Sequence, residues 1–394
     1  MSSQSNRAGI ALFLEYPLAD RGGVSVLVEE LILAFGEEFA VWLISPDSSE
    51  DVLKSPVGHL LEGHVRFVLT HLPPSGRYDE LASSLVEKLK EAGIKLVHFH
   101  CGGTFGWGNR WPGRSMPRAF SRAGLKTVWT NHLTEPAAKA FAARGRSKRL
   151  SGALGPVGRL GKILQTRAVD TEIAVSEHDR DYLQAHYPAG RALKRIYHSR
   201  LRESILASTS IREPLILAVG HIAFRKGQHF LVRAFLEIAA SVPDWRLEIA
   251  GHDGGDGCWQ EIQSLCASHP QGSRVNLLGA HSRPSDLMSR ASIFVQPSLE
   301  EALGLAVQEA IFLGCPAIGT RVGGIPEVID EGITGLLVEP GSAEAIAAAL
   351  TRLISDSGLR QEFGARGREA ILRKGMTAPR MADAHRSLYL ELLA

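Results

Sequence analysis

The stretch of sequence that decides the fold runs Ile293-Phe294-Val295-Gln296-Pro297-Ser298-Leu299-Glu300-Glu301-Ala302-Leu303-Gly304-Leu305-Ala306-Val307-Gln308-Glu309-Ala310-Ile311. Its first three residues are typical of a buried strand. A helix is predicted to begin near Leu303, because apolar residues then recur at the spacing of one buried helical face. The strand, loop and helix together indicate a parallel α/β sheet, in which ligands bind beyond the carboxyl ends of the strands.

Polar groups of this stretch suit a sugar linked to a diphosphate. Free backbone N–H groups at a helix start bind phosphate, which makes Leu303, Gly304 and Leu305 candidate binding residues. Glu301 and Glu309 can accept hydrogen bonds from sugar hydroxyls. The alternative interpretation is that both glutamates are solvated residues of a helix surface.

The segment resembles the Glu-x7-Glu motif of retaining family 4 glycosyltransferases (glycosyl transferases group 1) of the GT-B fold. The resemblance continues through residues 314–316, 323–328 and 335–338. It implies an α/β protein of two Rossmann-like, doubly wound domains that face each other across a cleft. It also implies transfer of a sugar from a nucleotide-diphosphate sugar to a hydroxyl acceptor, with retention of anomeric configuration.

Length and composition agree with a two-domain globular protein. The chain has 394 residues, more than one hydrophobic core usually organises, and is 44% hydrophobic and 22% charged. We expect an acceptor-binding domain over residues 1–205 and a nucleotide-sugar-binding domain over residues 206–375. Residues 376–394 are expected to form a helix, and in the family such a tail packs back on the first domain.

Short apolar strands alternate with helical stretches along both halves of the chain, which predicts two parallel sheets. In the first half we expect strands at residues 9–13, 41–44, 65–68, 96–99, 127–130 and 172–175. In the second half we expect them at residues 215–220, 245–251, 275–279, 293–297 and 317–319. A single long helical tail is expected over residues 364–393.

Glycine-rich turns lie where a phosphate would need close approach of the backbone. Gly22 and Gly23 precede the first helix, and Gly220 ends the first strand of the second half. A glycine has no Cβ to block a phosphate. By the resemblance, Gly22 and Gly23 would face the donor pyrophosphate, whereas the alternative is a purely structural turn.

Two adjacent cations follow Gly220, in the sequence His221-Ile222-Ala223-Phe224-Arg225-Lys226-Gly227. This looks like the family's Gly-Arg…Lys-Gly element, whose cations offset the charge of the leaving diphosphate. Here the residue after Gly220 is His221 and not Arg. We therefore expect Arg225 to supply the missing guanidinium beside Lys226, and His221 to be a loop residue.

Histidines end two strands of the first half. His132 matches the family's Thr-x-His element, so the resemblance implies that it contacts the transferred sugar or the acceptor. His100 matches a weaker His-x-His signal and is expected to line the acceptor side. The alternative for both is a structural histidine at a strand end. His198 lies where many relatives carry an Asn-Gly pair, and no chemistry is assigned to it.

Positive charge is concentrated in the first half of the chain. Between Ala92 and Val169 there are fourteen Lys or Arg residues and one acid, Glu135, with aromatic residues interleaved. Such a surface attracts an anionic membrane or a phosphorylated lipid. A solvated basic face is the alternative, and nucleic acid is not expected because no nucleic-acid-binding module is recognised.

The remaining sequence features favour a cytoplasmic protein without a metal centre. The chain begins with polar residues, no apolar run approaches about 18 residues, and the four cysteines lack paired or metal-ligand spacing. The resemblance implies that no cofactor or metal is needed beyond the nucleotide-sugar donor. Peripheral attachment to the inner membrane face is the further prediction.

The sequence thus predicts a metal-independent, retaining glycosyltransferase with a sugar or lipid-linked acceptor. Glu301 is assigned to the sugar hydroxyls, Glu309 to the donor ribose, Arg225 and Lys226 to the diphosphate, and His132 to the sugar or acceptor. Two alternatives remain at this stage. One is a non-hydrolysing nucleotide-sugar epimerase, and the other is a catalytically impaired protein that binds sugar nucleotides.

Overall fold

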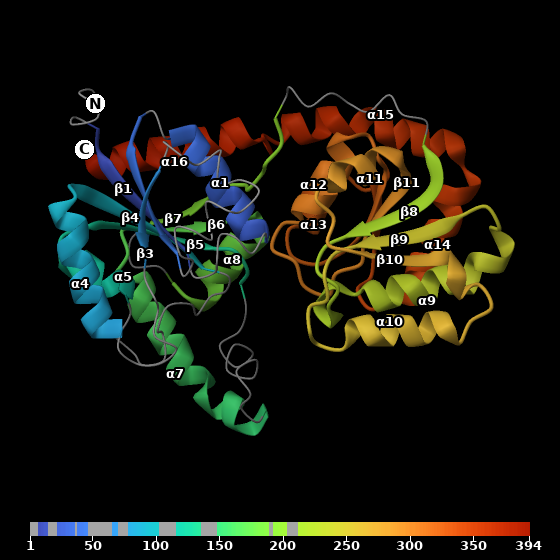
Figure 1. The fold of residues 1–394 in the computed structure, drawn as a ribbon, viewed down its shortest axis with the longest axis horizontal. Helices are drawn as coiled ribbons and strands as arrows, with labels where there is room; N and C mark the ends of the chain where they lie inside the picture. The colour runs from blue at the N-terminus through green and yellow to red at the C-terminus, as the bar shows by residue number, and fades with distance from the viewer. Residues whose placement is uncertain are drawn as a thin grey trace. The chain divides into compact units, whose positions relative to one another are not determined.

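A computed structural model describes residues 7–14, 22–35, 38–45, 65–69, 78–101, 116–134, 148–188, 192–202 and 212–394. The chain divides into two compact units (Figure 1). Unit 1 consists of residues 1–200 and 378–394, and unit 2 of residues 201–377. Each unit contains one parallel sheet, which confirms the α/β fold.

Unit 1 is built on a seven-stranded sheet in the order β3-β2-β1-β4-β5-β6-β7. All neighbouring strands are parallel. The strands are β1 (Gly9–Leu14), β2 (Ala40–Ser45), β3 (Val65–Leu69), β4 (Ile94–Cys101), β5 (Lys126–Asn131), β6 (Thr171–Ala174) and β7 (Ala192–Arg195). The order reverses between β1 and β4, so this sheet is doubly wound.

Helices of unit 1 bury the apolar sheet residues. The described helices are α1 (Gly23–Phe35), α4 (Tyr78–Glu91), α5 (Met116–Arg122), α7 (Lys148–Thr166), α8 (Glu177–His186) and α16 (Ala378–Leu393). Although α16 is last in the chain, it packs on α1 and β4. Its Tyr389 is fully buried, and the ring centroid lies 5.5 Å from that of Phe35 and 6.1 Å from that of Phe39.

Unit 2 contains a six-stranded parallel sheet in the order β10-β9-β8-β11-β12-β13. The strands are β8 (Glu213–Val219), β9 (Arg246–Ala250), β10 (Val275–Gly279), β11 (Ala291–Gln296), β12 (Ala317–Thr320) and β13 (Gly335–Val338). The main helices are α9 (Gln228–Ile238), α10 (Cys258–Ala267), α11 (Pro284–Arg290), α12 (Leu305–Phe312), α13 (Ile325–Val328), α14 (Ala343–Ser355) and α15 (Ser357–Arg373), with short 3-10 turns that include η1 (Phe224–Lys226).

The structure confirms the eleven expected strands and adds β7 and β13. Two helix boundaries predicted from the sequence differ from those in the structure. Helix α12 begins at Leu305 because Gly304 has a φ of +91°, a left-handed conformation that does not continue a helix. The expected long tail is two helices, because Gly375 with a φ of +69° ends α15 before α16 begins at Ala378.

One lysine of the expected basic surface is buried. Lys162 of α7 is 1% exposed, and its Nζ lies 2.5 Å from Oε1 of Glu172 in β6, also 1% exposed. Asn131 bridges the pair, because its Nδ2 donates to the same Glu172 oxygen and its Oδ1 accepts from Lys162. The prediction that Lys162 lies on a solvated or membrane-binding face is therefore wrong.

Removing one member of this pair should destabilise the protein strongly. Lys162→Met leaves the Glu172 carboxylate buried without its cation, and we expect a loss of about 3–5 kcal/mol in the free energy of unfolding. The double variant Lys162→Met/Glu172→Leu should recover most of that loss, because it removes both charges.

The measurement is urea-induced unfolding, with Arg159→Met on the same helix as the exposed control. A double variant as unstable as the single one would show that the loss comes from packing and not from an unpaired charge.

Candidate functional site

The carboxyl ends of β8 and β11 are neighbours in unit 2, and the loops that follow them carry the predicted donor-binding residues. Gly220 follows β8 directly, and η1 then carries Arg225 and Lys226. The other loop contains Glu301 and leads into α12. The sheet thus brings together two motifs that are separated by 75 residues in the chain.

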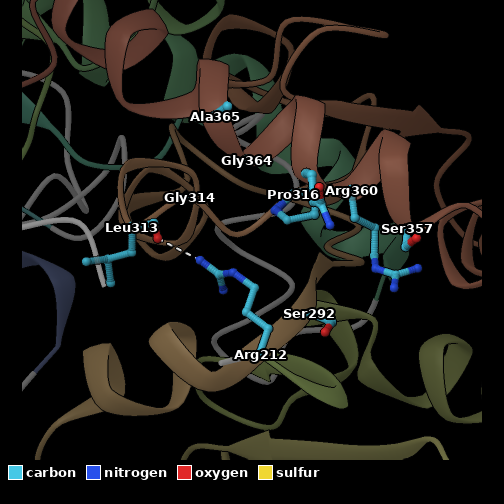
Figure 2. A pocket seen from close by; sticks show the side chains of 10 residues that line it. Arg212, Ser292, Leu313, Gly314, Pro316, Ser357, Arg360, Gly364 and Ala365 are labelled. Atoms are coloured by element: carbon cyan, nitrogen blue, oxygen red, sulfur yellow. Dashed lines mark hydrogen bonds between the residues drawn. The ribbon is translucent and has the colours of Figure 1, made fainter. Parts of the chain in front are cut away.

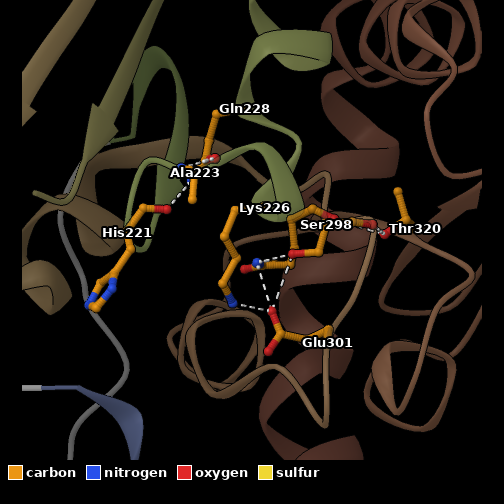
Figure 3. Close-up of polar contacts among 8 residues, drawn as sticks. His221, Ala223, Lys226, Gln228, Ser298, Glu301 and Thr320 are labelled. Atoms are coloured by element: carbon orange, nitrogen blue, oxygen red, sulfur yellow. Dashed lines mark hydrogen bonds and ion pairs between the residues drawn. The ribbon is translucent and has the colours of Figure 1, made fainter. Parts of the chain in front are cut away.

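An ion pair joins the two loops. Lys226 Nζ lies 2.6 Å from Glu301 Oε2, and each side chain is 14% exposed. The same carboxylate oxygen accepts hydrogen bonds from Ser298 Oγ at 3.2 Å and from Gln296 Nε2 at 3.3 Å. Figure 3 shows the contacts of Lys226 and Ser298 meeting at the Glu301 carboxylate. Glu301 Oε1 has no hydrogen-bond partner among the described residues, so it remains able to accept from a ligand.

Close contact of the two loops requires a glycine. Gly227 has a φ of +69°, and a Cβ at this position would lie 2.0 Å from the carbonyl oxygen of Pro297. The backbone N–H of Leu299 donates to the carbonyl of Arg225 at 2.8 Å, which ties η1 to the second loop. Thr320 Oγ1 donates to the Ser298 carbonyl at 2.6 Å and anchors that loop from β12.

A second glycine turn supports the loop from the other side. A Cβ on Gly323 would lie 1.6 Å from the Glu301 carbonyl oxygen, and Gly324 N donates to the Ala302 carbonyl at 2.9 Å. The main chain at Glu301 is therefore enclosed by two turns. The carboxylate is held both by its own partners and by its backbone.

The other predicted cationic residues are placed differently from Lys226. Arg225 is exposed, and its side chain has no hydrogen-bond or ion-pair partner within the part of the chain that the structure describes. The His221 ring packs against that of His252 at an interplanar angle of 47°, with ring centroids 3.8 Å apart, and the His221 carbonyl accepts a hydrogen bond from Gln228. Figure 3 shows the His221 ring pointing away from Lys226 and Glu301.

The start of α12 lies beside this ion pair. Leu303 and Gly304 are buried, and Leu305 is the first helical residue, so its N–H group and the next ones have no acceptor within the helix. Glu309 lies one turn into α12 and is 8% exposed. In unit 1, Gly22 and Gly23 stand at the start of α1, whereas the preceding residues 15–21 lie outside the described residues.

Unit 1 holds a cluster of five histidines, which comprises His98, His100, His132, His198 and His385. His100 Nδ1 lies 3.2 Å from His132 Nε2, and the His98 and His100 ring centroids are 4.0 Å apart. The cluster covers the carboxyl ends of β4 and β5 and is completed by α16. The structure therefore joins His100 to His132, both of which the sequence singled out.

Burial keeps this cluster neutral. Desolvation is the main cause that holds the pKa of all five histidines below the ordinary value, and neighbouring imidazoles lower the pKa of four of them further. For His385 the pKa falls to about 4. Protonating one of these imidazoles would place a positive charge where water cannot solvate it, and would add repulsion if a neighbouring imidazole were also charged.

Sequence reasoning missed part of both sites. His198 received no role, and His385 and Tyr389 were not considered because α16 follows the cluster by more than 170 residues. Gln296 and Thr320 were also missed. The only signal for Gln296 was a polar residue at the end of an otherwise apolar strand, which is typical of a sheet edge that carries a site.

A cavity of about 510 Å³ lies at the opposite, amino ends of β8, β11 and β12 (Figure 2). Its two guanidinium groups belong to Arg212 and Arg360. Arg212 donates to the carbonyls of Met288, Ala291 and Leu313, and Arg360 to those at the end of α14. Both side chains therefore cap the carboxyl ends of helices, which is a structural role.

The described ranges contain no group of three or more His, Cys, Asp or Glu side chains arranged to hold a metal ion. The Asp-x-Asp triplet at residues 179–181 has divergent carboxylates, since Asp179 accepts from Thr134 whereas Asp181 pairs with Arg180. Among the same residues, no helix combines the length and the apolar character that crossing a bilayer requires.

The two parallel sheets with their flanking helices have the GT-B fold of glycosyltransferases, as similar solved structures show. A glycosyltransferase of Rickettsia africae ESF-5 has a TM-score of 0.74 at 18% identity and covers 98% of this chain and 99% of its own. Anabaena Alr3699/HepE, solved with UDP, has a TM-score of 0.73 at 15% identity and covers 97% and 100%. At these low sequence identities, the structural similarities show the fold alone.

Sequence comparison identifies the family. Residues 21–198 match the model described as Glycosyltransferase Family 4, and residues 202–370 match the one described as Glycosyl transferases group 1. Together the two matches span most of the chain, which therefore belongs to the family 4 glycosyltransferases.

A curated relative, N-acetyl-alpha-D-glucosaminyl L-malate synthase of Bacillus anthracis, is 31% identical over 202 residues. The matched segment is 51% of this chain and 52% of the relative, so it spans about half the length of that protein.

The histidine cluster should make unit 1 sensitive to acid. In the unfolded chain each imidazole titrates near 6.5, whereas in the folded protein the lowered pKa keeps it neutral. Stability is therefore complete above about pH 6.5 and is lost as the pH falls towards the folded pKa, by up to about 1.4 kcal/mol per pH unit for each histidine.

Urea midpoints between pH 8 and pH 5 measure this loss, and His385→Leu should give a shallower dependence because it removes one titrating group. An identical slope in that variant would contradict the assignment of acid sensitivity to the cluster.

Proposed function

We propose that this protein transfers a sugar from a nucleotide-diphosphate sugar to a hydroxyl acceptor, with retention of anomeric configuration and without a bound metal. The observation that carries the proposal is the Lys226–Glu301 ion pair beside the start of α12, at the carboxyl edge of the unit 2 sheet. A cation and a helix N-terminus suit a diphosphate, and a fixed carboxylate oxygen suits a sugar hydroxyl.

The donor is assigned to unit 2. Lys226 and the exposed Arg225 would contact the diphosphate, together with the backbone at Gly220, Leu303, Gly304 and Leu305, and Glu309 would accept from the ribose hydroxyls. Glu301 Oε1, which has no partner among the described residues, would accept from a hydroxyl of the sugar. The structure of Anabaena Alr3699/HepE with UDP-glucose supports a uridine or related diphosphate sugar as the first donor to test.

The acceptor is assigned to unit 1. His132 is half-buried and would contact the sugar or the acceptor, with His100 behind it and Gly22 and Gly23 near the donor pyrophosphate. In the proposed step the sugar–phosphate bond breaks as the acceptor oxygen bonds to the same face of the sugar. The acceptor proton passes to the leaving diphosphate, whose charge Lys226 and Arg225 offset.

The experiment that tests the function is a donor screen. The full-length protein is incubated with UDP-, GDP- and ADP-linked sugars, with and without candidate hydroxyl acceptors, and nucleoside diphosphate release is measured in the presence of EDTA. Acceptor-dependent release supports the proposal, and anomeric NMR of the product tests retention. Conversion to an epimeric sugar nucleotide, or binding without release, would overturn it in favour of an epimerase or an inactive binding protein.

The two glutamates should separate binding from turnover. Glu309→Ala is expected to weaken nucleotide-sugar binding by about 1.5–3 kcal/mol, because it removes charge-assisted hydrogen bonds. Glu301→Ala should lower kcat more than affinity, because it acts on the sugar.

Calorimetry with the donor found in the screen measures the first effect, with the exposed Glu362→Ala as the control. An unchanged affinity of the Glu309 variant for every nucleotide sugar would remove its assignment.

The cationic residues should differ in importance. Arg225→Ala and Lys226→Ala are each expected to lower kcat by about a hundredfold or more, because they would stabilise charge that develops on the leaving diphosphate. His221→Ala should lower kcat only mildly, since the His221 ring packs against His252 and points away from the ion pair.

Steady-state kinetics measure these effects, with Arg233→Ala as an exposed control in the same unit. An inactive His221 variant beside a fully active Arg225 variant would reverse the two roles.

We propose further that the basic surface between Trp107 and Arg167 attaches unit 1 to an anionic membrane and brings it to a lipid-linked acceptor. In the described part of this surface, α7 exposes Val157 and Leu160 by 40% and 50%, next to the exposed Arg159. Apolar side chains beside arginines are typical of a helix that lies on a bilayer. Residues 102–115 and 135–147, with five of the thirteen Lys and Arg residues of this surface, lie outside the described residues.

Vesicle binding should therefore depend on salt and on charge. Each Lys or Arg near an anionic surface contributes about 1 kcal/mol, and the attraction is screened over about 8 Å at physiological ionic strength. The triple change of Arg146, Lys148 and Arg149 to Ser should abolish most sedimentation with anionic vesicles.

The matched control changes Arg283, Arg352 and Arg366 of unit 2 to Ser and should bind like the original protein. Absence of binding to anionic vesicles at low salt would favour a water-soluble acceptor.

A further inference from the structure

The hydrogen bond between His100 and His132 carries information about which nitrogen of His132 holds a proton. Burial and the neighbouring imidazoles keep both rings neutral. A neutral imidazole has one N–H donor and one bare acceptor nitrogen. The contact of 3.2 Å between His100 Nδ1 and His132 Nε2 therefore has two forms, in which either ring is the donor.

The second nitrogen of His100 distinguishes the two forms. His100 is fully buried, and its Nε2 has no hydrogen-bond partner among the described residues. If His132 were the donor, the proton of His100 would lie on Nε2, as a buried N–H group with no acceptor in the described part of the chain. If His100 donates from Nδ1, only a bare acceptor nitrogen is left unpaired. Orphaned buried N–H groups are the rarer of the two in proteins.

His385 shows the same arrangement in the same cluster, where its ring centroid lies 5.5 Å from that of His98. Its Nδ1 lies 2.8 Å from the Met381 carbonyl oxygen, which can only accept, so His385 must carry its proton on Nδ1. Its Nε2 is then a bare acceptor, and it too is buried without a partner in the described ranges. The cluster thus already contains one imidazole whose unpaired nitrogen is an acceptor.

His98 packs against His100, with ring centroids 4.0 Å apart, and has the opposite tautomer. Tyr389 is fully buried, and its Oη lies 2.6 Å from His98 Nδ1, its hydrogen-bond partner among the described residues. Burial raises the pKa of Tyr389, so the phenol stays protonated and donates a hydrogen bond to His98 Nδ1. His98 therefore carries its own proton on Nε2 and donates to Thr130 Oγ1 at 2.7 Å.

We propose that His100 is a positioning residue that donates from Nδ1 to His132 Nε2 and so places the His132 proton on Nδ1. The half-buried His132 then carries a neutral N–H donor at Nδ1 instead of a basic nitrogen. This rests on the proposed function, in which His132 meets the sugar or acceptor, and it gives that contact a direction. His132 donates a hydrogen bond to an oxygen of the substrate, and it does not remove the acceptor proton.

The direct test is a long-range ¹H–¹⁵N NMR spectrum of the full-length protein labelled with ¹⁵N-histidine at pH 7.5, with signals assigned from single histidine variants. We expect His132 and His385 to show the pattern of the Nδ1–H tautomer and His98 that of the Nε2–H tautomer. An Nε2–H tautomer at His132 overturns the proposal. The NMR measurement does not require enzymatic activity, so a failure of this proposal can be distinguished from a failure of the proposed function in the donor screen.

Variants of His100 connect the tautomer to turnover. His100→Leu removes the donor, so His132 should take up the Nε2–H form, and kcat should fall by about tenfold, the factor carried by one neutral hydrogen bond. KM for the donor should not change. His100→Asn keeps an N–H group near the original Nδ1 and should restore both the tautomer and most of kcat.

The matched control is His385→Leu, which removes another buried imidazole of the cluster but no hydrogen bond to His132. It should leave the His132 tautomer unchanged, and its kcat measures the effect of removing a buried imidazole from the cluster. A His100→Leu variant that retains the Nδ1–H form, or one whose kcat falls no further than in His385→Leu, contradicts the positioning role.

Discussion

The candidate donor site depends on the ion pair between Lys226 and Glu301, because this contact joins two loops that leave neighbouring strands. A charge pair that is only 14% exposed on each side loses much of its hydration, so it is favourable only when other hydrogen bonds satisfy the carboxylate. Ser298 and Gln296 supply those bonds. The left-handed turn at Gly227 then lets the loops approach closely enough for the pair to form.

Unit 1 achieves a fixed polar site by the opposite means. Its cluster contains no ion pair among the five imidazoles, and burial keeps them neutral. Neutral rings can pack at 4.0 Å, and they can exchange hydrogen bonds whose direction is set by their partners. A carbonyl or a phenol that bonds to one ring nitrogen thereby determines whether the other nitrogen is a hydrogen-bond donor or an acceptor. The proton positions follow from packing, and the same packing makes the site sensitive to acid.

The strands were predictable because their apolar residues are local signals, and both sheets form where those runs occur. Errors arose where a single residue or a distant partner overrode the pattern. Gly304 and Gly375 adopt left-handed conformations that end or delay helices with otherwise continuous apolar periodicity. Lys162 reads as a solvated charge in the sequence, yet Glu172 and Asn131 accept it inside unit 1.

The sequence by itself determined the two-domain α/β fold, the family and the motifs that contain Glu301, Lys226 and His132, because these depend on local periodicity and on short spacings. Only the tertiary structure decided which side chains meet. Parallel strands bring residues 226 and 301 to one edge, and α16 carries His385 and Tyr389 back to β4 across nearly 300 residues of chain. Such contacts depend on burial and on the order of strands in a sheet, and a linear pattern contains neither. The roles of the site residues remain predictions for the same reason, since a motif states which groups are present and only their arrangement around a substrate states what they do.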